Sequence, residues 1–260
     1  GRQRFRQAGH LDGEAGSRTE HCPGRYTVAI GTGRRPDDLS GCGQRVRVAG
    51  AKKRSLFRLI KALFIDLDGV IRIWEPGYIA EVEEMLGLPQ GAYANAAFGP
   101  ELIKQVTTGR ITAEEWRAET GRRLRETHPE LDVAELIRLW DAAPVRVDEE
   151  VLEIVRAVRL QVPVSLITNA TSRLPLELRQ LGIEDEFDHI FNTSDLGVAK
   201  PDPEVFRLIM DRVGVEAPAS MFVDDHPENV RSAAALGMRA HLYKDAASLR
   251  RDLLDAGFAL

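Results

Sequence analysis

Hydrophobic and polar positions follow two alternating patterns from residue 59 to the end of the chain. Short apolar runs that stop at polar residues predict buried strands, whereas apolar residues three or four positions apart predict amphipathic helices. The runs that predict strands are 59–65, 162–167, 189–192, 221–223 and 240–243. The segments with helical spacing between them are 149–160, 174–181, 203–213 and 228–236. This order predicts an α/β fold with a doubly wound parallel sheet and helices on both of its faces.

The stretch between the first two predicted strands has only the helical pattern. Its apolar residues recur at helical spacing near 77–87, 100–106, 112–126 and 132–141. Thr112 and Glu115 have the spacing of a capping box, in which each side chain bonds the backbone N–H of the other residue. We therefore expect a small α-helical insertion at 77–145 and a core domain composed of 55–76 and 146–260.

Residues 1–54 differ from the rest in composition. They are rich in Gly and Arg and carry few large apolar side chains, so they cannot bury enough apolar surface to offset the entropy of ordering. We expect them to be a disordered or non-native basic leader. Both cysteines, Cys22 and Cys42, lie in this segment, so the core domain needs no disulfide, which fits a cytoplasmic protein.

Charge and hydropathy narrow the range of partners. The chain of 260 residues has a formal net charge of −5, and because residues 1–54 are net positive, the remainder is more acidic still. This balance argues against nucleic acid as the main partner of the folded part. No apolar run approaches the roughly 20 residues of a membrane-spanning helix, so we expect no membrane partner. The sequence leaves the oligomeric state open.

Acidic side chains follow two of the predicted strands, at the edge of the sheet where doubly wound folds bind ligands. The first strand leads into Asp66 and Asp68, and the fourth leads into Asp224 and Asp225. Several carboxylates in one crevice repel one another, and a hard divalent cation with all-oxygen ligation, typically Mg²⁺, relieves that repulsion. An acidic loop, or a helix N-cap before Pro227, would leave the same pattern.

Four short motifs, each placed after a predicted strand, resemble the signatures of the haloacid dehalogenase-like (HAD) hydrolase superfamily in the superfamily's own order. They are FIDLDGV at 64–70, LITN at 166–169, TSDLGVAKPDP at 193–203 and FVDD at 222–225. The likeness covers residues 59 to about 243. A helical insertion between the first two motifs is similar to the subfamily in which a helical cap closes over the site. The resemblance implies a Rossmann-like core with a small α-helical cap.

The resemblance also implies a Mg²⁺-dependent phosphohydrolase that acts on a small phosphorylated metabolite. Asp66 would be the nucleophile that becomes an aspartyl-phosphate, and Asp68 the general acid and base. Two further catalytic residues would be Lys200 and Thr168. The residues expected to bind the substrate are Thr168, Asn169, Lys200 and Gly69.

The expected metal ligands come from the same motifs. By resemblance, Asp66 and Asp225 bind Mg²⁺ directly, Asp68 contributes its backbone carbonyl, and Asp224 acts mainly through water or through Lys200. His226 and Asn229 lie close to the fourth motif, but we expect neither to have a functional role, since a lone His in that position is usually a cap or a surface residue. We expect that the cleft is lined by Trp74, Tyr78, Trp116 and Arg117. The aromatic residues at helical spacing could equally fill the insertion's interior, which we favour for Trp116 and Trp140.

The sequence leaves three alternative functions to weigh. A phosphomutase or phosphotransferase would use the same residues and exclude water. A haloacid dehalogenase would share the first Asp but, in the resembling superfamily, needs neither metal nor an acid at the position of Asp68. Both Asp68 and the Asp224–Asp225 pair therefore argue against dehalogenation. A non-catalytic binding domain would be expected to have lost one of the motif acids, and all are present.

Overall fold

The computed structural model describes residues 59–260. The expectation of a disordered or non-native leader at 1–54, with Cys22 and Cys42, lies outside the described residues. Within 59–260, no helix combines the length and the apolar character that crossing a bilayer requires.

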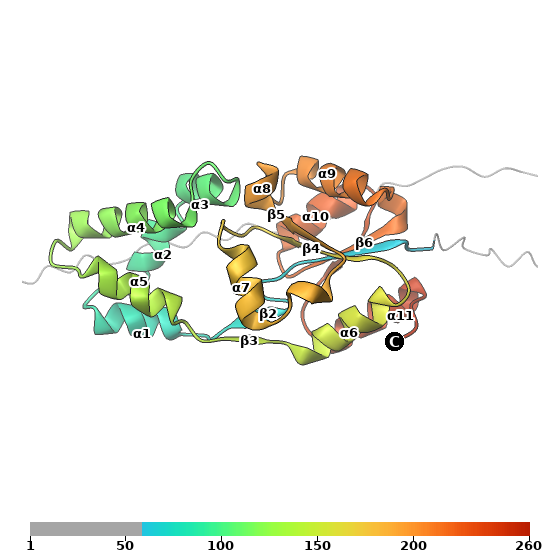
Figure 1. Ribbon diagram of the computed structural model, residues 1–260, viewed down its shortest axis with the longest axis horizontal. Coiled ribbons are helices and arrows are strands. Elements are labelled where there is room, and N and C mark those ends of the chain that lie inside the picture. The colour runs from blue at the N-terminus through green and yellow to red at the C-terminus, as the bar shows by residue number, and fades with distance from the viewer. Residues whose placement is uncertain (1–58) are drawn as a thin grey trace, which may run out of the picture. The chain divides into compact units, whose positions relative to one another are not determined.

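A five-stranded parallel sheet forms the centre of the fold, in the order β5-β4-β1-β6-β7 (Figure 1). Its strands are β1 (Ala62–Ile65), β4 (Val164–Thr168), β5 (His189–Asn192), β6 (Ser220–Asp224) and β7 (Arg239–Leu242). From β1 the chain runs outward through β4 and β5, then crosses back to β6 and β7 on the other side of β1. This reversal of strand order confirms the doubly wound sheet and places a ligand-binding crevice at the carboxyl ends of the central strands.

Both faces of the sheet are covered, which is why its strands appear as continuous apolar runs. Leu63 and Ile65 of β1 pack on one face, and Ala62 and Phe64 pack on the other. The first face is covered by α6 (Glu149–Arg159), α7 (Leu174–Leu181) and α11 (Ala246–Ala256). The second is covered by α9 (Pro203–Val213) and α10 (Pro227–Ala235). Of these five helices, α11 was not predicted. Three shorter helical elements complete the sheet domain, namely α8 (Thr193–Leu196), η1 (Glu184–Glu186) and η2 (Ala217–Ala219).

Five helices lie between β1 and α6 in the sequence and have an apolar core of their own. They are α1 (Tyr78–Met85), α2 (Ala92–Ala97), α3 (Pro100–Thr107), α4 (Ala113–Thr127) and α5 (Val133–Asp141). We call Tyr78–Asp141 the helical insertion. The capping box of Thr112 and Glu115 begins α4 as predicted. Helix α2 was not predicted, because six residues are too few to show a helical period.

A two-stranded antiparallel ribbon joins the helical insertion to the sheet domain. Its strands are β2 (Arg72–Trp74) and β3 (Val145–Val147), and Trp74 pairs with Val145. The sequence placed residue 145 at the end of the insertion, whereas the structure has it as the first residue of β3. Strands of three residues are too short to be recognised by alternation, so the ribbon was not predicted.

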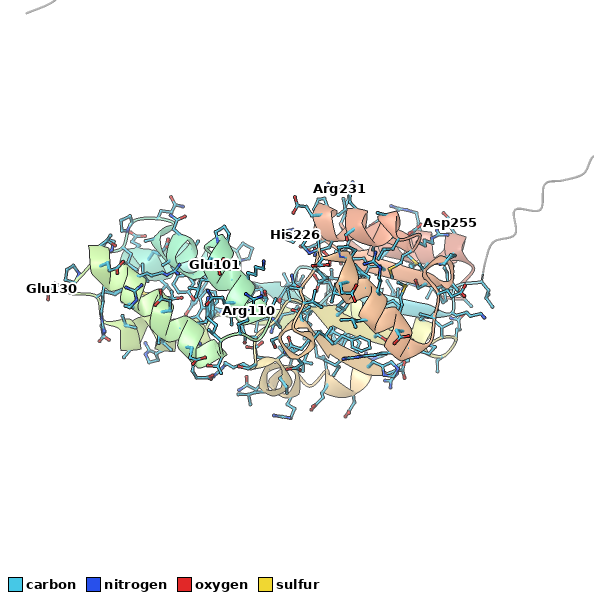
Figure 2. The ribbon with its side chains drawn as sticks, turned by 90° about the horizontal axis from the view of Figure 1, so that it is seen from above. Glu101, Arg110, Glu130, His226, Arg231 and Asp255 are labelled. Atoms are coloured by element: carbon cyan, nitrogen blue, oxygen red, sulfur yellow. The ribbon has the colours of Figure 1, made fainter. Side chains whose placement is uncertain are left out.

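The helical insertion also touches the sheet domain directly. Gly109, in the turn after α3, has φ +66°, and a Cβ added there would lie 2.0 Å from the carbonyl oxygen of Ser194. Nearby, the backbone N–H of Ala113 donates a hydrogen bond of 3.1 Å to Ser172 Oγ. In the orthogonal view, Arg110 lies at the end of the insertion that faces His226 of the sheet domain (Figure 2). Only a residue without a Cβ permits the approach at Gly109.

We predict that Gly109→Ala lowers the free energy of unfolding by more than Gly182→Ala does. Both glycines have positive φ, so both substitutions introduce backbone strain of about 1–2 kcal/mol. Gly182 has nothing within 4 Å of the added Cβ, so only Gly109→Ala adds a clash, which we expect to cost roughly 1 kcal/mol more. Urea denaturation of the two variants measures the difference. Equal losses would show that the turn does not pack against Ser194 in solution.

Candidate active site

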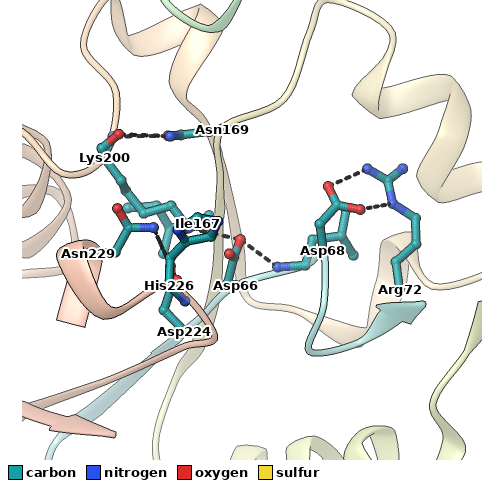
Figure 3. Close-up of polar contacts among 10 residues, drawn as sticks. Asp66, Asp68, Arg72, Ile167, Asn169, Lys200, Asp224, His226 and Asn229 are labelled. Atoms are coloured by element: carbon teal, nitrogen blue, oxygen red, sulfur yellow. Dashed lines mark hydrogen bonds and ion pairs between the residues drawn. The ribbon is translucent and has the colours of Figure 1, made fainter. Parts of the chain in front are cut away.

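The carboxyl ends of three neighbouring strands bring the predicted polar residues together (Figure 3). Asp66 directly follows β1, Thr168 is the last residue of β4, and Asp224 is the last residue of β6. Parallel strands that pair side by side end at the same edge, so residues far apart in sequence meet there. Thr168 is buried beside Ile167, whose carbonyl faces the same crevice.

Lys200 lies at the centre of this crevice as a buried ammonium. Its Nζ is 2.8 Å from Asp66 Oδ1 and 2.7 Å from Asp224 Oδ2, and its side chain is only 1% exposed. It also donates to the carbonyl oxygen of Ile167 at 3.0 Å. Burial lowers the pKa of Lys200, but the two carboxylates raise it by more, so the group stays charged. The structure therefore pairs Lys200 with Asp66 as well as with Asp224.

Asn169 holds the loop that carries Lys200. Its Nδ2 donates to the Lys200 carbonyl at 2.8 Å, and its Oδ1 accepts from the Lys200 backbone N–H at 2.9 Å. Both ends of the amide are thus engaged with one residue. The sequence suggested substrate binding for Asn169, and in the structure its amide holds the backbone of Lys200 in place.

Asp224 is completely buried and held by several donors. Its Oδ1 accepts from the backbone N–H of His226 at 2.7 Å, and Asn229 Nδ2 lies 3.0 Å from both carboxylate oxygens. His226 itself is exposed and precedes α10, as expected of a cap residue. Asn229, by contrast, is buried and contacts Asp224, a contact that the sequence did not single out. Its position in the first turn of a helix that starts beside Asp224 was the available signal.

Asp66, Asp224 and Asp225 each offer a carboxylate oxygen within 4.8 Å of the others. Lys200 supplies one positive charge against these three acids. Burial raises the pKa of Asp66 to about 8, although Lys200 opposes the shift, and burial together with Asp224 raises the pKa of Asp225. Ionising all three acids beside a single lysine is therefore unfavourable without a further cation. An all-oxygen donor set of this kind fits Mg²⁺.

Gly69 lies against Asp225 rather than in open space. A Cβ at Gly69 would be 2.2 Å from Asp225 Oδ2, and its φ is +77°. The glycine that the sequence suggested for substrate binding thus makes room for one of the clustered carboxylates. Any larger residue there would force the Asp225 carboxylate to shift.

Asp68 points away from Asp66 and toward the ribbon (Figure 3). Its two oxygens accept from Arg72 Nε and Nη2, each at 2.7 Å, and Trp74 Nε1 donates to Oδ1 at 2.7 Å. Arg72 also pairs with Glu177 of α7 at 2.7 Å. Arg72 was not singled out from the sequence, because its strand was not predicted. The two acids of the first motif therefore have separate surroundings, one in the sheet crevice and one held by β2.

Comparisons with known proteins point to one family. A family model described as haloacid dehalogenase-like hydrolase matches residues 60–237. Bifunctional epoxide hydrolase 2 of Rattus norvegicus is 24% identical over 212 residues, which are 75% of this chain but only 38% of that protein. The chain thus spans well under half of that relative's length. A sesquiterpene phosphatase of Aspergillus oryzae is 29% identical over 181 residues, covering 68% of this chain and 87% of the relative.

Solved structures show the same fold. A HAD family enzyme of Bacteroides thetaiotaomicron, solved in complex with magnesium and inorganic phosphate, superposes with a TM-score of 0.58 at 23% sequence identity. The match covers 71% of this chain and 94% of that one. At this identity the likeness supports the architecture of the sheet and its helices.

We predict that Lys200→Met, studied in a chelating buffer, destabilises the protein by about 3 kcal/mol or more near pH 8. Without the ammonium, the pKa of Asp66, which burial already raises, rises further above its unfolded value. Because a raised carboxyl pKa penalises the folded state as the pH rises, the loss should be smaller near pH 5. Urea denaturation at both pH values measures it, with Lys61→Met at an exposed position as the control. A loss that does not depend on pH would contradict the pairing.

Proposed function

Because this chain belongs to the haloacid dehalogenase-like hydrolases, we propose that it is a Mg²⁺-dependent phosphohydrolase acting on a small phosphorylated metabolite. The observation that carries the proposal is the buried cluster of Asp66, Asp224 and Asp225 around Lys200. Two comparisons support it, since one relative is a sesquiterpene phosphatase and one structural neighbour was solved with magnesium and phosphate.

In this proposal Asp66 attacks the phosphorus atom. Within residues 59–260, the contacts to its carboxylate from the Leu67 N–H and from Lys200 both go to Oδ1. Oδ2 is then the oxygen that forms the bond to phosphorus while the bond from phosphorus to the alcohol oxygen breaks. The alcohol oxygen takes a proton from Asp68. Water then attacks the phosphorus atom of the aspartyl-phosphate and gives a proton to Asp68. This hydrolysis releases phosphate and restores Asp66.

The remaining residues would stabilise charge and hold position. Asp66 and Asp225, with the Asp68 backbone carbonyl, would hold Mg²⁺, which when bound neutralises charge on the transferring phosphoryl oxygens. Lys200 lies 2.8 Å from Asp66 Oδ1 and so adds a second positive charge beside the nucleophile. Thr168 would bind a phosphoryl oxygen through its hydroxyl group. The helical insertion would act as a cap that excludes water while the ester reacts.

Phosphoryl transfer to a second alcohol is the main alternative, and it would use the same residues. Dehalogenation has less support, because the carboxylate cluster and the Asp68–Arg72 pair have no part in it. A non-catalytic domain has less support still. Such a domain would be expected to have lost a motif acid, whereas here the acids are present and the Lys200 ammonium lies 2.8 Å from Asp66.

We expect Asp66→Asn to lower kcat for p-nitrophenyl phosphate by at least about a thousandfold, as loss of a nucleophile does. The asparagine amide has the shape of the acid but does not form the aspartyl-phosphate. Circular dichroism checks that the variant is folded. Asp255→Asn, at an exposed position at the end of α11, is the matched control and should keep the wild-type rate (Figure 2). Substantial turnover by Asp66→Asn would refute the nucleophile assignment.

Chelation should silence the enzyme, and added Mg²⁺ should restore it. The reason is that three buried acids with one lysine cannot accept a phosphate dianion without another cation. The measurement is the rate of phosphate release before EDTA, after EDTA, and after Mg²⁺ is returned. In the same assays a 2-haloacid should release no halide. A rate that survives exhaustive chelation would count against the metal site, and halide release would favour dehalogenation.

A further inference from the structure

A cavity of about 270 Å³ opens beside Asp68, between the ribbon, the helical insertion and the loop after β4. Its wall includes Trp74 of β2, Trp116 of α4 and Trp140 of α5, along with Phe98 at the end of α2. The proposed general acid, Asp68, is also on this wall. Since the general acid gives its proton to the departing alcohol oxygen, this cavity is on the leaving-group side of the site.

Aromatic carbon forms much of the wall. The ring centroid of Trp140 lies 6.3 Å from that of Trp74, 6.1 Å from that of Phe98 and 6.2 Å from that of Trp116. The indole N–H groups of Trp74 and Trp116 are engaged with Asp68 and with the Ala97 carbonyl, so these rings offer carbon surface rather than donors. Trp116 is buried at 5% exposure and also serves the insertion's interior, as the sequence suggested.

Two of the aromatic side chains are too exposed to be explained by packing alone. Phe98 is 45% exposed and Trp74 is 40% exposed, and both lie on the cavity wall. Leaving this much aromatic surface in water is unfavourable by roughly 25 cal/mol per Å². An apolar group placed in the cavity would cover both rings.

Most polar side chains on the wall are already paired with protein groups. Arg72 pairs with Asp68 and Glu177, and Arg117 pairs with Asp141 through its terminal nitrogens, although its buried Nε has no partner within the described residues. Asn169 is bound to the Lys200 backbone, and Thr107 Oγ1 donates to the Ile103 carbonyl at 2.8 Å. A leaving group rich in hydroxyls, such as a sugar, would have to break these pairs or bury hydroxyls without partners, which is costly.

On the premise that the proposed phosphohydrolase function holds, we infer that the substrate is a phosphate monoester of a predominantly apolar alcohol, whose hydrocarbon part fills this aromatic cavity. The volume sets the size of that part. A cavity of about 150 Å³ accepts one benzene ring, so about 270 Å³ corresponds to a hydrocarbon group of one to two rings. The phosphoryl group would lie at Asp66, and the ester oxygen beside Asp68.

The test compares two esters of primary alcohols, 2-(1-naphthyl)ethyl phosphate and glycerol 1-phosphate, with Mg²⁺ present. Both have a poor leaving group, so a difference in kcat/KM reports the cavity rather than the chemistry. We expect the naphthyl ester to be favoured by at least about tenfold, the lower end of what one apolar increment contributes to specificity. Equal rates, or a preference for the glycerol ester, would overturn the inference and leave the phosphohydrolase function standing.

A matched pair of variants locates the effect. Phe98→Ser removes an exposed ring from the cavity wall and should reduce the preference for the naphthyl ester severalfold. Met85→Ser, which removes an apolar side chain of 63% exposure from the same insertion and outside the cavity wall, should leave the preference unchanged. Equal losses for both esters in Phe98→Ser would mean a structural effect and would overturn the inference. If neither ester nor p-nitrophenyl phosphate is hydrolysed, the proposed function fails, and the inference fails with it.

Discussion

The ammonium of Lys200 joins groups from three strands that are distant in the sequence. It contacts Asp66 after β1, Asp224 at the end of β6 and the Ile167 carbonyl in β4. These acids could not remain ionised side by side in a buried crevice without it. One charge is too few for three carboxylates, however, and burial raises the pKa values of Asp66 and Asp225, which opposes their ionisation. The lysine thus allows the cluster to form, and the excess of carboxylates over lysines favours the binding of a cation.

The two acids of the first motif are separated by one residue but belong to different parts of the molecule. Asp66 is fixed by Lys200, whereas Asp68 is fixed by Arg72 and Trp74 of the ribbon that leads into the helical insertion. Any movement of the insertion carried through β2 would reposition Asp68 and leave Asp66 in place. The proposed nucleophile, Asp66, would need a constant geometry, and the proposed general acid, Asp68, would benefit from being attached to the element that contacts the departing group.

The sequence predicts the sheet domain well, because a strand buried on both faces leaves a continuous apolar run and a polar residue at its end. Asp66, Lys200 and Asp224 could be assigned to one crevice on that basis, with the help of family resemblance for Lys200. Arg72 and Asn229 could not, because each acts through a contact with a site residue and leaves no periodic signal. Their placement depends on how a three-residue strand and the first turn of α10 meet the crevice, which is a matter of tertiary packing.

The site is divided into a charged half and an apolar half, and Asp68 stands between them. On one side are three carboxylates and a lysine, suited to a phosphoryl group and a cation. On the other are aromatic rings, and most of the polar side chains beside them are already paired. A phosphate monoester has the same division, because its charge is confined to one end. Apolar walls around the leaving group also exclude water from the charged half, which strengthens each electrostatic contact there. The aromatic cavity would therefore contribute to the rate of reaction as well as to the choice of substrate.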